Sequence, residues 1–288
     1  MATGIGSQKS PLELYRIAKK TGMWDPESIP VAEDLADWQR LNDDQREQLL
    51  RICALSYEGE VSVADTLAWW LIAMPEPDRR VFLAMQIFEE VKHADFFAHY
   101  FRHVLGNVDT RKYLNPTYRT VLVDGLRARG EAIGRAILAA NGSGSGSDGD
   151  DGGTPPPRAS DDLERALILG MAHYMGIIEG TLAASGYDYF EEMLGTRKIF
   201  PRLLEGIRLI RADEGRHIVH GMDYLRQRLA SRPEYKELVA QLFFEESMRA
   251  TARADFIFER NGFGLDRERM IALSMDHLAQ RSHEVGLT

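Results

Sequence analysis

The chain has 288 residues, 44% of them hydrophobic, and a formal net charge of -9 at neutral pH. This length allows one large core or two smaller ones, and the acidic balance argues against nucleic-acid binding, which needs a basic surface. The lone cysteine, Cys53, excludes an intramolecular disulfide and fits a reducing compartment. The first ten residues do not resemble a signal peptide, and the apolar run 66–74 is too short to span a bilayer. We therefore expect a cytoplasmic protein with no integral membrane segment.

Hydrophobic residues recur with a helical period along nearly every long segment, and no window shows the alternation of a strand. Asn42 offers the N-cap of the first long helix, Pro75 and Pro77 end it, and Gly106 ends the second. The expected helices, in chain order, cover about 43–73, 78–105, 113–140, 161–193, 201–229, 233–259 and 265–283. The sequence thus predicts an all-α fold.

The stretch 141–160, which reads NGSGSGSDGDDGGTPPPRAS, is of low complexity and cannot pack a core. It marks either a domain boundary or a flexible crossover within a single domain, 1–288. We favour the crossover, because each half of the chain carries only half of the candidate site described next. A crossover that links two helix pairs is typical of a ferritin-like four-helix bundle, here with additional flanking helices.

The most informative pattern is a pair of Glu-x-x-His steps, each with a lone glutamate upstream. By composition alone, two such steps are only mildly surprising. However, every one of these side chains interrupts an apolar stripe on its helix. In dinuclear carboxylate bundles, two helices each give one Glu and two others each give a Glu-x-x-His. The candidate metal ligands are accordingly Glu60, Glu90, His93, Glu179, Glu214 and His217.

Charge supports a metal site over a structural role. A single glutamate on a helix is usually solvated or hydrogen-bonded, whereas a buried, unpaired one costs several kcal/mol. Four core-facing glutamates need a shared compensating charge, which two divalent metals supply. Carboxylates and imidazoles suit Fe and Mn, and the lack of thiolate ligands argues against Zn or an Fe–S cluster. The spacing does not choose between Mn/Fe and Fe/Fe, nor does it say which glutamate bridges.

The order of these residues resembles the R2 subunit superfamily of ribonucleotide reductases, from about Trp24 to the fifth expected helix. The run 23–29, MWDPESI, is similar to the Trp-containing N-terminal segment of that family. Asp213 matches the aspartate that bonds the first metal-binding histidine, here His93, and such contacts fix the ring of a ligand. The resemblance implies a homodimer and makes Trp24 a candidate electron relay.

Two details select a subgroup. Phe97 stands four residues after His93, where most reductase subunits carry their radical tyrosine. Val63 and Tyr174 match the R2-like ligand-binding oxidases, in which a tyrosine oxygen is joined to a valine β-carbon. That family binds a heterodinuclear Mn/Fe centre with a long-chain fatty acid bridging the metals. The resemblance implies that Mn is held by Glu60, Glu90 and His93. It implies that Fe is held by Glu179, Glu214 and His217.

The residues themselves are compatible with this chemistry. Val63 lies one turn from Glu60 on the metal-facing side, and its β-carbon carries a tertiary, relatively weak C–H bond. We therefore expect an O2-activating oxidase that performs two-electron oxidation and forms a Val63–Tyr174 ether cross-link. The alternatives are a reductase small subunit that makes a radical for a partner and a ferritin-like metal storage protein. The substrate and the lining of any acyl tunnel stay open. Among the other histidines, we expect His173 to lie at the surface or be hydrogen-bonded, and His220 to be solvated.

Overall fold

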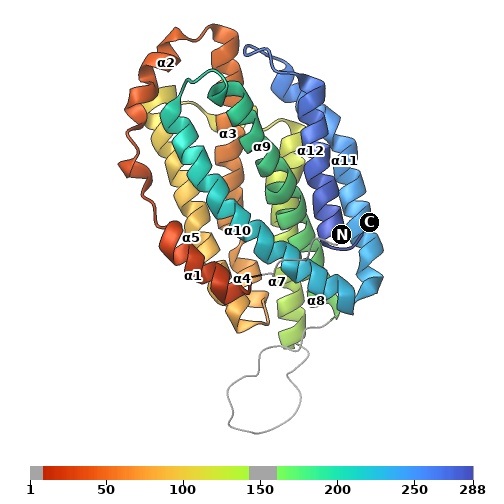
Figure 1. Cartoon of the computed structure of the whole chain (residues 1–288). Helices are drawn as coiled ribbons and strands as arrows, with labels where there is room; N and C mark the ends of the chain where they lie inside the picture. Colours follow the sequence, from red (N-terminus) through yellow and green to blue (C-terminus); the bar gives the residue numbers. More distant parts are fainter. Residues whose placement is uncertain (1–8, 143–160, 288) are drawn as a thin grey trace, which may run out of the picture.

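The computed structural model describes residues 9–142 and 161–287, and within them all regular structure is helical (Figure 1). The all-α expectation is confirmed. Most of the predicted crossover, 143–160, lies outside the described residues. The long helices run side by side as a bundle, with α11 and α12 along one flank and α1 and α2 along the other.

Two core helices come from the first half of the chain. They are α3 (Asp43–Thr66) and α5 (Pro77–Tyr100), which pack along each other. Asn42 caps α3 through reciprocal bonds with Gln45, and a proline opens α5. The single helix expected over 43–73 is interrupted at Leu67, after which α4 (Ala68–Ala73) begins. Just before this break, the hydroxyl of Thr66 donates to the carbonyl of Ser62, a contact that bends helices.

The other two core helices come from the second half. One is a continuous helix that comprises α8 (Asp161–Met171), the π-helical segment η6 (Ala172–Ala183), α9 (Ala184–Phe190) and a second π-helical segment, η7 (Glu191–Gly195). The other is α10 (Pro201–Ser231), which packs on η6 and α5. Single π turns are frequent at functional sites, and η6 holds both Glu179 and Tyr174.

Flanking helices cover this core. The α7 helix (Leu126–Gly142) packs on α8 and α4, while α11 (Lys236–Phe258) and α12 (Arg267–Glu284) pack on each other and on η6. Short elements join the long ones: η1 (Pro26–Ser28), η2 (Val31–Asp34), α2 (Leu35–Arg40), η3 (Phe101–Leu105), η4 (Thr110–Tyr113), α6 (Pro116–Tyr118), η5 (Arg119–Gly125) and η8 (Pro233–Tyr235).

The first helix, α1 (Pro11–Thr21), was not among the expected elements. It packs on α5 and α10 and so closes one side of the core. The sequence marks the start of this helix, because Ser10 and Glu13 form a capping box and a proline occupies the first turn. This signal, rather than apolar periodicity, identifies the helix.

The buried apolar side chains form one continuous cluster that draws on both halves of the chain. The stretch Asp161–Gly195 is long and apolar enough to cross a membrane by length and composition. However, 83% of its apolar window is buried inside the protein. That burial is what the central helix of a bundle shows.

Candidate metal centre

The structure brings all six sequence-predicted ligands together in the interior. They come from α3, α5, η6 and α10, and every one of them is buried. They form two groups, in each of which ligand atoms lie within 4.8 Å of one another. The first group is Glu60, Glu90, His93 and Glu214; the second is Glu90, Glu179, Glu214 and His217. Glu90 and Glu214 belong to both groups, so the geometry makes them the candidates to bridge two metals.

The histidines direct their Nδ1 atoms at the carboxylates. Nδ1 of His93 lies 3.5 Å from Oε2 of Glu60 and 3.5 Å from Oε1 of Glu214. Nδ1 of His217 lies 3.0 Å from Oε1 of Glu90 and 3.4 Å from Oε2 of Glu214. Among the described residues, neither Nδ1 atom has a hydrogen-bond partner, and Oε2 of Glu214 also lacks one. Buried polar atoms are rarely left unpaired in this way, and a metal ion is the partner that these donors fit.

Electrostatics leads to the same conclusion. Burial raises the pKa of Glu60 and of Glu179 well above the usual value, and neighbouring carboxylates raise both further. With neutral histidines, four ionised glutamates carry a charge of about -4, which two divalent cations would cancel. Metal binding would therefore displace protons from this cluster.

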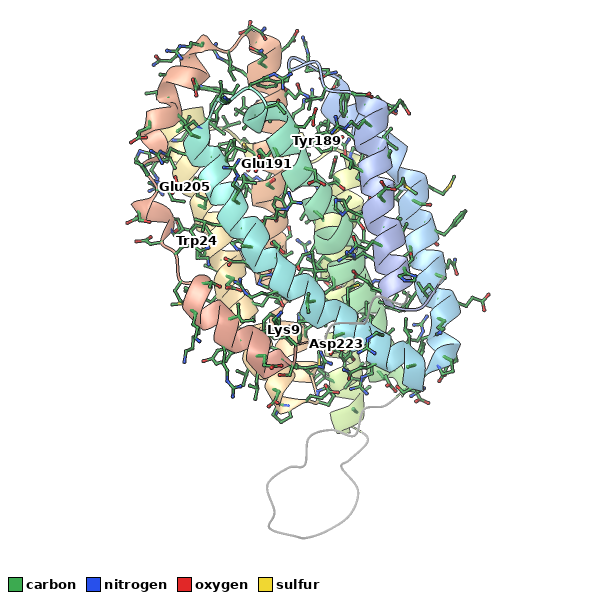
Figure 2. The ribbon with its side chains drawn as sticks, in the orientation of Figure 1. Lys9, Trp24, Tyr189, Glu191, Glu205 and Asp223 are labelled. Atoms are coloured by element: carbon green, nitrogen blue, oxygen red, sulfur yellow. The ribbon has the colours of Figure 1, made fainter. Side chains whose placement is uncertain are left out.

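Behind the first histidine lies a hydrogen-bonded chain. Nε2 of His93 is 3.2 Å from Oδ2 of Asp213, and the same oxygen accepts from Nε1 of Trp24 at 2.8 Å and from Nζ of Lys92 at 2.7 Å. Trp24 lies on the connection that follows α1 (Figure 2). Burial raises the pKa of Asp213, but the bonds from His93 and Lys92 outweigh it and hold that pKa well below the ordinary value. Asp213 is thus an ionised acceptor that orients His93 and links it to Trp24.

A corresponding acid, which was not predicted from the sequence, lies behind the second histidine. Oε2 of Glu89 lies 2.8 Å from Nε2 of His217, and Arg216 contacts both Glu89 and Asp213. A signal for it exists: an acid directly precedes the glutamate of each Glu-x-x-His step. Each of these acids supports the histidine of the other step.

The two residues of the expected cross-link both lie at the cluster. The hydroxyl of Tyr174 donates to Oε1 of Glu90 at 2.8 Å and accepts from Nε2 of Gln86 at 2.7 Å. Val63 is buried and lines the same cavity as Glu90. Burial and the nearby carboxylates raise the pKa of Tyr174 well above 10, so its phenol is protonated at neutral pH. Neither Gln86 nor its contact with Tyr174 was expected from the sequence.

A cavity of about 120 Å³ adjoins the cluster. Glu60, Glu90, Glu179 and Glu214 line it, together with apolar side chains that include Ile52, Leu55, Leu122, Ile178 and Ile257. Tyr187 also lines it, and the hydroxyl of this buried side chain has no hydrogen-bond partner in the described parts of the chain. The cavity is therefore acidic at the cluster and largely apolar elsewhere.

Two other histidines test the expectations about this residue type. His173 is buried and its Nε2 lies 3.0 Å from the carbonyl oxygen of Val121, as expected for a hydrogen-bonded histidine. The expectation for His220 was wrong, because this side chain is buried against Phe82, with ring centroids 4.6 Å apart. The cause is tertiary, since α5 covers this face of α10.

Four helices that gather two Glu-x-x-His steps and two further glutamates define a ferritin-like bundle of the R2 type. Solved structures share this fold. An R2-like ligand-binding oxidase, as a Tyr-to-Phe variant with aerobically reconstituted Mn/Fe cofactor, is 23% identical, with a TM-score of 0.82 and 100% of both chains covered. A Val-to-Ala variant with anaerobically reconstituted Mn/Fe cofactor gives the same values. Residues 12–272 match the family described as ribonucleotide reductase, small chain, and this chain belongs to that family.

Proposed function

We propose that this protein is an O2-activating oxidase with a heterodinuclear Mn/Fe centre, which binds a long-chain fatty acid, performs two-electron oxidation and forms a Val63–Tyr174 ether. The observation that carries the proposal is the Tyr174 hydroxyl, hydrogen-bonded to Glu90 at the edge of a cavity that Val63 lines. The fold shared with R2-like ligand-binding oxidases that carry Mn/Fe supports it. We place its activity in the cytoplasm, in keeping with the single reduced cysteine.

The ligand set divides between two metals. Mn would be held by Glu60, Glu90 and His93, and Fe by Glu179, Glu214 and His217, with Glu90 and Glu214 placed to bridge. An Fe/Fe centre fits the same donors. When bound, the metals supply the electrons with which O2 is reduced. Asp213 and Glu89 would orient the two imidazoles and keep their Nδ1 atoms directed at the metals.

The cross-link is an oxidation in which this chain is its own substrate. The Cβ–H bond of Val63 and the O–H bond of Tyr174 break, and one Cβ–O bond forms. Two electrons and two protons leave and pass to O2, which, with two further electrons that the metals would supply and two further protons, is reduced to two molecules of water. Glu90 is placed to take the phenol proton, and Gln86 fixes the direction of the phenol oxygen.

The cavity supplies the fatty-acid site. Its acidic end lies at the metal ligands, where a carboxylate would be bound by the two cations rather than by the protein. Its apolar wall would hold the chain, because burying each methylene group contributes about 0.8 kcal/mol. The same wall excludes water from the reacting groups.

One observation favours the rival function, a reductase small subunit. Trp24, Asp213 and His93 form a continuous hydrogen-bonded chain from the cluster to a half-buried indole, a route by which an electron could leave the site. Against it, Phe97 is fully buried and cannot store a tyrosyl radical at the family's usual position.

Mass spectrometry of peptides that contain Val63 and Tyr174 tests the proposal. After loading with Mn and Fe in air, we expect a linked species that lacks two hydrogens, and after anaerobic loading we expect separate peptides. Tyr174→Phe should abolish the link, whereas Tyr187→Phe, which removes a neighbouring cavity phenol, should retain it. Separate and unmodified peptides from the wild-type protein after aerobic loading would overturn the oxidase assignment.

A further inference from the structure

One charged residue that lines the cavity is not among the candidate metal ligands. Arg253, on α11, lines the cavity and is only 3% exposed. No residue of α11 belongs to either group of metal ligands. Among the described residues, none of the six ligands forms a hydrogen bond or ion pair with Arg253. The guanidinium is therefore a polar feature of the cavity away from the metal centre.

The partner of Arg253 is also buried. Glu246 stands seven residues earlier on the same inward face of α11, is 1% exposed, and forms an ion pair with Nη2 of Arg253. The rest of this face is apolar, with Val239, Phe243 and Ile257 buried. A buried ion pair of this kind adds little stability over a well-packed apolar pair. Stability alone therefore gives no reason for a guanidinium in the wall of an apolar cavity.

One donor of the guanidinium remains free. Within the described residues, Nη1 of Arg253 has no hydrogen-bond partner, and neither carboxylate oxygen of Glu246 has one, although the two side chains form an ion pair. Leaving a buried donor unpaired costs about 1–3 kcal/mol, so this atom is suited to an acceptor oxygen of a ligand. Because Glu246 already balances the charge, a second carboxylate would bring an uncompensated buried charge. A neutral oxygen, such as a hydroxyl or keto group, fits better.

The side chains around Arg253 are suited to an acyl chain that runs past its guanidinium. Tyr118, Ala254 and Ile257 line the same cavity, as does Tyr189, which Figure 2 shows on α9 toward α12. Such a wall would hold the methylenes on either side of one oxygen atom. Chain length between the metal-bound carboxylate and Arg253 then decides which carbon carries that oxygen.

Building on the proposed function, we propose that the ligand is an oxygenated long-chain fatty acid, whose hydroxyl or keto oxygen accepts a hydrogen bond from Nη1 of Arg253. The carboxylate would lie at the end of the cavity lined by the metal ligands, and Arg253 would select among chains by the position of the second oxygen. A site built to bond an oxygen discriminates strongly against the analogue that lacks it, because its own donor would be left unpaired.

The test compares hexadecanoic acid with its monohydroxylated isomers on the metal-loaded protein. We expect one isomer, or adjacent isomers, to bind roughly tenfold more tightly than the parent acid, the effect of one buried hydrogen bond. In the double variant Arg253→Met/Glu246→Leu, which removes both charges together, the preference should disappear, and the parent acid should bind at least as tightly as to wild type because no buried donor is left unpaired. The variant Glu246→Gln keeps the guanidinium and should keep the preference.

Equal binding of all isomers by the wild type would overturn this inference, as would a preference that survives in the double variant. Either result leaves the oxidase assignment to be judged by the cross-link. If the wild type binds none of the acids while the cross-link forms, the fatty-acid class itself is wrong and this inference falls with it.

Discussion

At the scale of single residues, the acid that precedes each Glu-x-x-His step hydrogen-bonds the histidine of the other step. Asp213 precedes the second step and bonds His93 of the first, while Glu89 precedes the first step and bonds His217 of the second. Lys92 and Arg216 balance these two acids. The outer contacts are therefore close to neutral, and the charge of the four inner glutamates is left for the metals.

Because Glu89 and Asp213 bond different histidines, substituting each of them should weaken metal binding at a different one of the two positions. Glu89→Gln should weaken binding at the group that contains His217 by about 10- to 100-fold, because the imidazole loses its anionic partner. Asp213→Asn should weaken the group that contains His93 to a similar degree. Metal titration with element analysis after dialysis gives the affinity of each position. The control is Glu191→Gln, which changes a part-exposed acid that pairs with Arg208 rather than with a histidine, and this variant should bind both metals normally.

If both variants lose the same metal, or both metals equally, the acids do not act through separate histidines. The shared contact with Arg216 would then couple the two positions.

The sequence was sufficient for the ligands but not for their surroundings. Glu90 and His93 could be paired because residues three apart share a helix face. Gln86 and Tyr187 could not be recognised, since their contacts depend on how separate helices are placed. Arg253 is a similar case: nothing local tells a buried arginine from a solvated one. His220 was expected to be solvated, but a contact with Phe82 on another helix buries it.

At the scale of elements, apolar periodicity predicted the long helices but not their irregularities. The π-helical segment η6 lies inside a helix that the sequence predicted as continuous. Its apolar residues are so numerous that a wider turn leaves the pattern unchanged, as every residue over 172–181 is buried. The break at Leu67 was missed for the same reason, because apolar residues continue on both sides of it.

Close helix packing predicts different effects for two glycines of α10. A β-carbon at Gly206 would overlap the ring of Phe96 on α5, whereas at exposed Gly215 it would meet nothing within 4 Å. Gly206→Ala should therefore lower the free energy of unfolding by about 1–3 kcal/mol. Gly215→Ala should raise it by up to about 1 kcal/mol through helix propensity. Denaturant titration of both variants measures the difference, and equal effects would show that α5 and α10 are not in such close contact.

At the scale of the whole molecule, one exposed apolar stripe follows α5. Val81, Ala84, Phe88 and Val91 are all exposed and follow a heptad spacing of three, four and three residues. The opposite face of the same helix carries Glu90 and His93. Exposed apolar residues at this spacing lie on one face of the helix and are suited to packing against another helix. We propose that it forms the interface of a homodimer and that α5 links the interface to the metal centre.

Charge placed on this stripe should separate the protomers. Phe88→Glu would bury an unpaired carboxylate at the interface, which costs several kcal/mol, so the dimer dissociation constant should rise at least 100-fold. Phe244→Glu on α11, where the phenylalanine is equally apolar and 65% exposed, is the matched control and should leave the dimer intact. Sedimentation velocity over a concentration series measures both. A dimer that survives Phe88→Glu and dissociates in Phe244→Glu would move the interface to α11, next to Arg253 and the cavity.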